Sequence, residues 1–348
     1  MVEPILGPSR PGLVVPQRTD PTGRAGPTPG QARGPGWRRT SRGFYVPSHV
    51  TQENVEQRIV EASVLVPAGL GITGWAGLHW LGGRWFDGLT SHGEQRPVTI
   101  AISTHDIRPQ PAYGIAVSGE GLWRRMAVLV DGVWITRAAW SVSFEMRYAD
   151  TWRGSVVALD MAAYNDLVSV EEQAEFISHQ NGWNGVPKAR KALDYADENS
   201  WSPQEVLNRL VWQVDADLPR PLTNRPIFDL NGRHLGTPDL LDVETGLIGE
   251  YDGQGHLLRG QRARDVPRAE LLRAHDLESV TILADDFGNL DRYIERLKRA
   301  RATAKRRQSP TRLWTIDQPP WWTPTLTVAQ RRALTADQRA RLLKHRSA

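Results

Sequence analysis

The sequence predicts an α/β protein, with an α+β domain at residues 37–198 and an α/β domain at residues 199–304. Two observations lead to this prediction. In the second domain, apolar residues repeat first with helical and then with strand periodicity, in the order α-β-β-β-α-β-α. In addition, a chain of 348 residues is long enough for two cores.

The composition excludes several classes of site. The chain contains no cysteine, so disulfides, thiolate zinc sites and cysteine nucleophiles are excluded. No run of 18 apolar residues occurs, and a membrane-spanning helix is therefore not expected. The N-terminus also lacks the apolar centre of a secretory signal. We expect a cytoplasmic protein with no membrane partner.

The two ends of the chain differ in composition from its middle. Residues 1–36 are rich in Pro, Gly, Arg and Thr, so we expect a disordered arm that buries too little apolar surface to fold. Residues 1–43 hold seven arginines against two acids, and residues 291–348 hold 15 basic against four acidic residues. Basic ends around an acidic centre indicate arms that bind a polyanion such as DNA. A GC-rich genome accounts for the arginine excess equally well.

The first domain begins with a short strand at residues 42–47, which Pro47 ends. A helix follows Thr51, whose side chain suits an N-cap. The other expected elements are a helix at 73–82, strands at 97–103, 112–118 and 126–130, and helices at 137–148, 153–165, 170–179 and 186–197. Seven tryptophans lie between residues 75 and 152. We interpret them as core residues, with base stacking as the alternative.

The second domain opens with a helix whose N-terminus is marked by Ser202, Pro203 and Glu205. Asn231-Gly232 is a strong hairpin signal between the first two expected strands. The expected elements are strands at 225–230, 233–243 and 246–252, a helix at 261–276, a strand at 278–284 and a helix at 285–304. Residues 305–348 form a basic, tryptophan-containing tail.

Four ionisable residues gather on and just after the second and third of these strands: Asp239, Glu250, Asp252 and His256. If residues 244–245 alone form the turn, Asp239 lies opposite Glu250, with Cβ atoms about 5 Å apart. Strand alternation places Asp252 on the same face as Glu250. A three-residue turn that ends in Gly246 shifts this register by one residue.

Carboxylates held together among apolar residues repel one another unless a cation binds between them. The pair Asp239 and Glu250 therefore predicts a site for Mg2+ or Mn2+, which take carboxylate oxygens and water and can activate water for hydrolysis. Glu205 is the expected third or water-mediated ligand, and its helix-capping role is the alternative. Asp252 can equally belong to an ordinary Asp-Gly turn, and His256 can be a loop histidine.

Pro238-Asp239, the segment from Glu250 to His256, and then Arg264-Asp265 and Arg268 resemble the very-short-patch-repair-endonuclease-like domains of the PD-(D/E)XK nuclease superfamily. The resemblance covers about residues 202–290. It implies a restriction-endonuclease-like α-β-β-β-α-β core and metal-dependent cleavage of DNA in repair, restriction or defence.

The same resemblance implies roles for individual residues. Asp239 and Glu250 correspond to the metal ligands, and Asp252 stands where the superfamily usually has a lysine. We expect His256 to act in its place as general base or water-orienting group, because its pKa suits proton transfer near neutrality. The residues expected to hold phosphate are Arg264, Arg268, Lys305, Arg306 and Arg307. Ion pairing with Asp265 is the alternative role of the first two.

The first half of the chain resembles actinobacterial AbiEi-like antitoxin or regulator proteins. This resemblance rests on residues 42–47, 74–82 and 131–136. It implies a toxin or a regulatory protein as a partner. The alternative function is therefore a DNA-binding regulator or antitoxin whose nuclease-like domain is catalytically inactive. A structural protein that uses the tryptophan-rich half for interactions is the third hypothesis.

Overall fold

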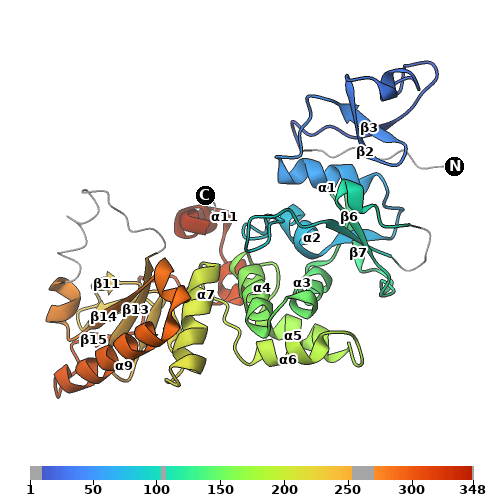
Figure 1. Cartoon of the computed structure of the whole chain (residues 1–348). Helices are drawn as coiled ribbons and strands as arrows, with labels where there is room; N and C mark the ends of the chain where they lie inside the picture. Colours follow the sequence, from blue (N-terminus) through green and yellow to red (C-terminus); the bar gives the residue numbers. More distant parts are fainter. Residues whose placement is uncertain (1–9, 103–106, 253–269, 347–348) are drawn as a thin grey trace. The chain divides into compact units, whose positions relative to one another are not determined.

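The computed structural model describes residues 10–102, 107–252 and 270–346 (Figure 1). The protein is of mixed α/β class and divides into two compact units. The first comprises Met1–Ala149 and Glu172–Val186, and the second comprises Asp150–Glu171 and Pro187–Ala348. The expected domain junction at residues 198–199 therefore lies inside the second unit.

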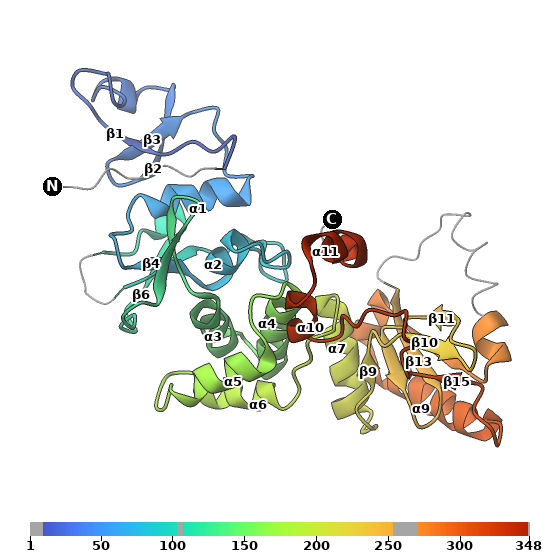
Figure 2. The ribbon, with the colours of Figure 1, turned by 180° about the vertical axis from the view of Figure 1, so that it is seen from behind.

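The first unit begins with an antiparallel sheet in the order β1-β3-β2 (Figure 2). Its strands are β1 (Gln17–Arg18), β2 (Trp37–Ser41) and β3 (Phe44–Pro47). The expectation of a disordered arm is thus wrong for residues 10–36. This segment buries little apolar surface, and hydrogen bonds hold it in place instead. The Asp20 carboxylate accepts hydrogen bonds from three backbone N–H groups of residues 22–25, and the Gln57 side chain bonds both backbone groups of Val14.

A five-stranded mixed sheet in the order β6-β5-β4-β8-β7 follows. Its strands are β4 (Gly71–Thr73), β5 (Val98–Ala101), β6 (Ile115–Ser118), β7 (Ala127–Val130) and β8 (Val133–Thr136). The sequence analysis predicts strands at the positions of β5, β6 and β7 but not at those of β4 and β8. The helices that begin in this unit are α1 (Val55–Ser63), α2 (Gly74–Trp80), α3 (Ala138–Tyr148) and α6 (Val186–Leu193). Helix α1 begins after Asn54 rather than Thr51, since the Asn54 side chain accepts the N–H groups of Glu56 and Gln57.

Several tryptophans are core residues, as the sequence suggested. Trp75, Trp80 and Trp140 are each at most 2% exposed. Trp75 and Trp80 donate their indole N–H groups to backbone carbonyls. The interpretation as core residues is confirmed for these three side chains.

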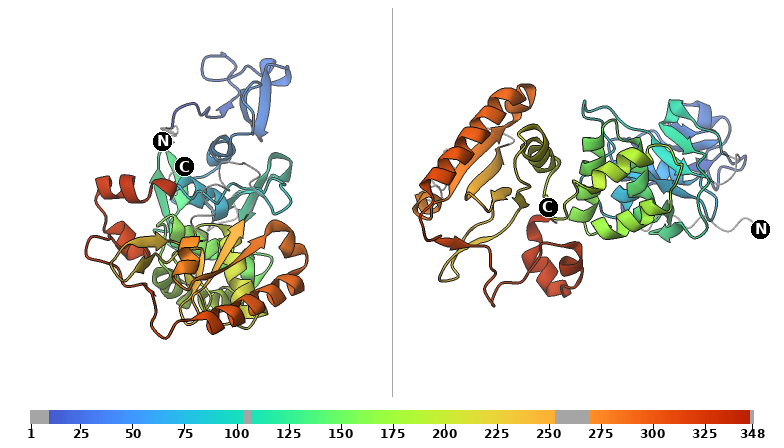
Figure 3. Two further views of the ribbon diagram at one scale, coloured as in Figure 1. Left: turned by 90° about the vertical axis from the view of Figure 1, so that its left-hand side faces the viewer. Right: turned by 90° about the horizontal axis from the view of Figure 1, so that it is seen from below.

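The second unit is built around a four-stranded sheet in the order β14-β13-β12-β9. Its strands are β9 (Leu222–Thr223), β12 (Leu240–Asp242), β13 (Leu247–Asp252) and β14 (Glu278–Leu283). Strands β13 and β14 are parallel, and the other pairs are antiparallel. Helices α7 (Pro203–Leu210) and α9 (Leu290–Arg307) lie along this sheet (Figure 3). The helices α4 (Trp152–Tyr164) and α5 (Val170–Ser178) precede it in the chain.

Strand alternation sends apolar side chains to both faces of this sheet. Leu240 and Leu247 pack with Tyr293 and Leu297 of α9 on one face. The next residue of each strand, Leu241 or Ile248, faces the other way and packs with Leu272, Leu277 and Trp314. The sheet is therefore covered on both sides, as expected for a mixed sheet in an α/β protein.

A second small sheet has the order β11-β10-β15, with β10 (Ile227–Asp229), β11 (His234–Gly236) and β15 (Trp314–Thr315). The hairpin predicted at Asn231-Gly232 is confirmed, with Gly232 at φ +81°. The single strand expected at 233–243 is wrong: β11 and β12 belong to different sheets. Pro238 lies between them, and proline cannot donate to a ladder. The first strand of the four-stranded sheet is β9, not the strand expected at 225–230.

The C-terminal segment is folded against the rest of the second unit. It contributes β15, α10 (Val328–Arg332) and α11 (Ala336–Leu342). Lys305, Arg306 and Arg307 end helix α9 and are not part of a separate tail. Among the described residues, no helix combines the length and the apolarity that a membrane crossing requires.

Candidate functional site

The ladder between β12 and β13 has the register that places the two acids opposite one another. Leu240 pairs with Gly249, and Asp242 pairs with Leu247. Continued by one residue, this register sets Asp239 across from Glu250. The observed pairs confirm the register in which Asp239 lies opposite Glu250. The alternative register, which a three-residue turn ending in Gly246 would produce, is wrong.

The turn between these strands is held by side-chain and backbone bonds. The Asp242 carboxylate accepts the N–H of Glu244 at 2.9 Å and the hydroxyl of Thr245 at 2.7 Å. The N–H of Gly246 bonds to the Asp242 carbonyl, and Gly246 has φ +70°. A positive φ favours glycine, so the sequence itself supplies this turn.

Asp239 is fixed by the two strands that flank it. Its carbonyl accepts the N–H of Asn224 at 3.0 Å, and its Oδ2 accepts the N–H of Tyr251 at 2.8 Å. The second bond holds the Asp239 carboxylate against the backbone of β13, beside Glu250. Both acids are partly exposed. Two carboxylates with access to water are a ligand set that Mg2+ accepts, because it keeps several waters when bound.

Asp252 ends β13 two residues beyond Glu250 and therefore shares its face. It does not complete a larger set. Within residues 10–102, 107–252 and 270–346, no group of three or more His, Asp or Glu side chains is arranged to hold a metal ion. His256, Arg264 and Arg268 lie outside the described residues. The described part of the site is thus the pair Asp239 and Glu250.

Glu205 belongs to a different, buried network. Its Oε2 accepts the N–H of Trp201 at 2.8 Å and the Nδ2 of Asn224 at 2.7 Å. Burial raises the pKa of the Glu205 carboxyl against the effect of these hydrogen bonds. The capping role of Ser202, whose Oγ accepts the Glu205 N–H, is confirmed. Among the residues that the structure describes, Glu205 belongs to no metal-binding group, and its carboxylate supports Asn224.

Asn224 links Glu205 to the acid pair, and no motif in the sequence indicates this role. Its backbone N–H bonds Asp239, while its side chain bonds Glu205. It is 2% exposed and has φ +41°, a left-handed conformation that asparagine tolerates better than most residues. Only the folded chain shows that a loop asparagine joins a helix to the edge of the acid pair.

The basic residues at the end of α9 lie near the β12–β13 turn. Lys305 Nζ is 3.2 Å from Glu244, and Arg307 is 2.7 Å from Glu278. The side chains of Lys305 and Arg307 are each 63% exposed. Arg306 donates to the Thr303 hydroxyl. Lys305 and Arg307 therefore link α9 to acids outside the helix, while the partner of Arg306 lies in α9 itself.

Comparison with known proteins gives relatives without an assigned role. The chain is 28% identical over 194 residues to the uncharacterized proteins MT2308 and Rv2248, from two strains of Mycobacterium tuberculosis. The matched region covers 54% of this chain and 69% of each relative. No family model matches the chain. No solved structure matches it either.

Proposed function

We propose that the second unit is a metal-dependent nuclease-like domain that acts on DNA phosphodiesters. The observation that carries the proposal is the ladder register that opposes Asp239 and Glu250, with Asp239 held by the N–H of Tyr251. Two carboxylates that share a sheet face and reach water are a ligand set that a divalent cation accepts. A divalent ion held there suits a phosphate substrate, whose oxygens complete the coordination.

The order of elements supports the same proposal. Helix α7 is followed by β9, β12 and β13 of the four-stranded sheet, with β10 and β11 inserted between β9 and β12, and then by a helical segment at 270–274. Strand β14 then returns parallel to β13. Apart from that insertion, this order is compatible with the α-β-β-β-α-β core that the resemblance implies, with Asp239 directly before β12 and Glu250 in β13.

The chain's own groups have separable roles in this proposal. Asp239 and Glu250 hold Mg2+ or Mn2+, which when bound polarises a phosphoryl oxygen and generates hydroxide from water. The N–H of Tyr251 orients Asp239, and Asn224 fixes the backbone behind it. His256 is the group proposed to move the proton. Lys305, Arg306 and Arg307 exchange their partners within the chain for DNA phosphates, which predicts binding that weakens with salt.

Metal binding and plasmid nicking test the proposal together. Asp239→Asn retains an oxygen that accepts the Tyr251 N–H but removes the charge. Exposed Asp285 provides the matched control, Asp285→Asn. We expect Mg2+ or Mn2+ to raise the melting temperature of the wild type and the control only. We expect Asp239→Asn to nick plasmid DNA about 10-fold to 100-fold more slowly than the wild type, the loss typical of weakened metal sites. Equal melting shifts and equal nicking in all three proteins would refute the proposal.

A second function has one specific observation in its favour. Asp252, at the position where the resemblance places a lysine, leaves the described site without a cationic group to polarise water. A DNA-binding regulator with an inactive nuclease-like domain, working with a toxin or a regulatory protein, fits this feature. It predicts DNA binding in the presence of a chelator, with affinity falling steeply as salt rises, and no nicking.

A further inference from the structure

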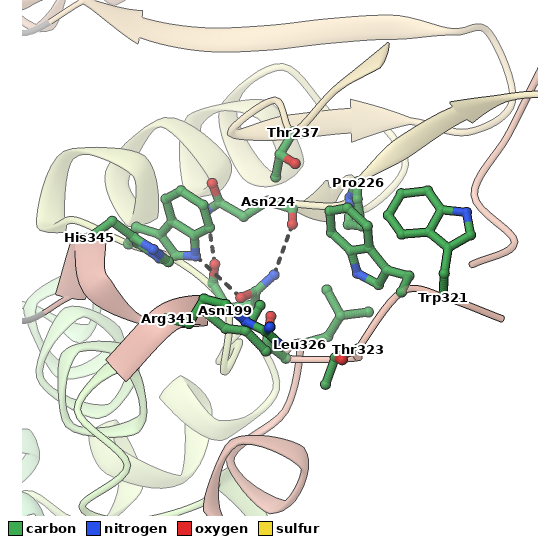
Figure 4. A pocket seen from close by; sticks show the side chains of 13 residues that line it. Asn199, Asn224, Pro226, Thr237, Trp321, Thr323, Leu326, Arg341 and His345 are labelled. Atoms are coloured by element: carbon green, nitrogen blue, oxygen red, sulfur yellow. Dashed lines mark hydrogen bonds between the residues drawn. The ribbon is translucent and has the colours of Figure 1, made fainter. Parts of the chain in front are cut away.

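A pocket of about 460 Å³ lies within the second unit, and Asn224, whose backbone N–H bonds the Asp239 carbonyl, is one of its lining residues (Figure 4). Its walls come from the segment before α7, from the loop after β9, and from the C-terminal segment between residues 321 and 345. Neither Asp239 nor Glu250 lines it. The pocket is large enough for a ligand the size of a nucleotide, since ligand pockets usually begin at about 300 Å³.

Aromatic side chains form two of its walls. His345 lies at one end in Figure 4 and Trp321 at the other. The His345 ring packs on Trp201 with 4.3 Å between centroids, and Trp321 packs on Trp322 at 5.6 Å. Trp322 also packs edge-on against the buried Phe228 at 5.0 Å. Each wall is therefore held by a second ring and offers a flat apolar surface.

The exposed tryptophans differ from those of the core. Buried Trp212 donates its indole N–H to a backbone carbonyl, as Trp75 and Trp80 do. In the described part of the chain, no protein acceptor meets the indole N–H of Trp321 or Trp322, and Trp321 is 63% exposed. A large aromatic surface and two N–H donors at a pocket are the features of a recognition site for a flat polar ligand.

The floor of the pocket is rigid. The Asn199 side chain donates to the carbonyls of Thr223 and Asn224 and accepts from the indole N–H of Trp201. Asn199 and Asn224 are 5% and 2% exposed. The amide groups that shape the floor are thus fixed before any ligand binds, which lowers the entropy cost of binding.

The charge of the pocket favours an anion. None of its lining residues is an aspartate or a glutamate. Arg341 lines it and is exposed, and within the described residues its guanidinium meets no acceptor of the protein. A guanidinium that has no carboxylate partner can donate two parallel hydrogen bonds to the oxygens of a phosphate.

We propose that this pocket binds a planar heteroaromatic base that carries a phosphate. The base stacks on Trp321, with Trp322 packed edge-on to that ring, and the phosphate pairs with Arg341. The same chemistry is offered by a free nucleotide and by an unpaired base of a nucleic acid strand. The proposal does not require a bound metal ion, because neither Asp239 nor Glu250 lines the pocket, although Asn224 contacts both the pocket and Asp239.

Binding is measured in the presence of a chelator. Calorimetry with the four deoxynucleoside 5′-monophosphates reports the free nucleotide. Fluorescence anisotropy reports a short single strand, a duplex with one unpaired base and the fully paired duplex. The test variants are Trp321→Ala and Arg341→Gln. Trp321→Phe retains a ring, and exposed Arg299→Gln on α9 repeats the charge change away from the pocket.

We expect at least one ligand with an accessible base to bind, and to bind about tenfold more weakly to Trp321→Ala and to Arg341→Gln, as losing one stacking contact typically does. Trp321→Phe and Arg299→Gln should bind nearly as well as the wild type. Binding of a monophosphate assigns the pocket to free nucleotides. Binding of only the strands with an unpaired base assigns it to nucleic acid. Absence of binding, or equal binding by all variants, overturns the proposal. Asp239→Asn should bind like the wild type, which separates this outcome from failure of the metal site.

Discussion

Arg147 is a cation that the first unit encloses almost completely, with 1% of its side chain exposed. Its guanidinium donates two hydrogen bonds to Glu120, at 2.7 and 2.6 Å. It also donates to the Asn184 carbonyl. A buried charge destabilises the folded state when its partner is removed. Glu120 therefore stabilises the fold by pairing with Arg147.

Glu120→Ala should therefore lower the free energy of unfolding by about 3 kcal/mol at neutral pH, the cost of leaving a buried charge unpaired. Chemical denaturation measures it. Glu94→Ala, an exposed acid of the same unit, is the control and should stay within about 0.5 kcal/mol of the wild type. A loss equal to that of the control would mean that Arg147 does not depend on Glu120.

The pH dependence of this pair follows from the same contacts. Desolvation favours the neutral acid, but the hydrogen bonds from Arg147 and Tyr148 outweigh it and hold the pKa of Glu120 below 4.5. A lowered acid pKa contributes stability above the unfolded value, and the contribution is lost as the pH falls through the folded pKa. The difference between wild type and Glu120→Ala should shrink below about pH 4.5. A constant difference between pH 3 and 7 would contradict this explanation.

At the scale of the element, the β12–β13 hairpin decides whether a site exists. A shift of one residue would send Glu250 to the opposite face from Asp239. The turn that prevents this shift depends on Asp242, which bonds the next turn residues and also accepts from Arg301 of α9 at 2.7 Å. Local sequence left two registers open, and the observed turn at residues 243–246 keeps the one in which Leu241 pairs with Ile248.

Gly246→Ala tests the turn. The glycine has φ +70°, and an added Cβ would lie 3.1 Å from the Asp276 carbonyl oxygen. We expect a loss of about 1–2 kcal/mol, the cost of a left-handed conformation for a residue with a side chain. Gly288→Ala is the control in the same unit, because its added Cβ meets nothing within 4 Å. Equal stability of the two variants, measured by urea denaturation, would contradict the role of Gly246.

Other elements were predicted only in part. The helix start at Ser202 and the hairpin at Asn231-Gly232 follow from capping and turn chemistry within a few residues. The split of residues 233–243 into β11 and β12 does not, because the partner of β11 is β10 and the partners of β12 are β9 and β13. Sheet membership depends on residues far along the chain.

At the scale of the whole molecule, the C-terminal segment is a structural part of the second unit. Arg331 is fully buried and reaches Asp166 at 2.7 Å, and it also donates to the carbonyls of Ala163 and Glu198. Trp314 is 2% exposed and packs in the core beneath β12 and β13. The sequence presents these residues as a basic, aromatic tail. In the folded protein they pack into the second unit and form part of its core.

A chain that ends at residue 312 tests this conclusion. It loses β15, α10 and α11, and with them Trp314 and Arg331. We expect a lower melting temperature and faster proteolysis, because a core side chain and a buried ion pair are removed together. Lys344→Ala, which changes an exposed basic residue of the same segment, should melt like the wild type. Unchanged melting of the shortened chain would show that the segment is a dispensable arm.

The sequence by itself determined the α/β class, the main helices and the Asn231-Gly232 hairpin, since each follows from periodicity or turn chemistry over a few residues. It left two registers open for Asp239 and Glu250, and the observed β12–β13 ladder decided between them. Only the tertiary structure decided that Glu205 supports Asn224, that Lys305 and Arg307 pair with acids, and that the C-terminal segment lines a pocket. Arg331 and Asp166 illustrate the reason: they are 165 residues apart, and no local pattern specifies such a contact. Burial of a charge or of an indole ring is a property of the folded chain rather than of its segments.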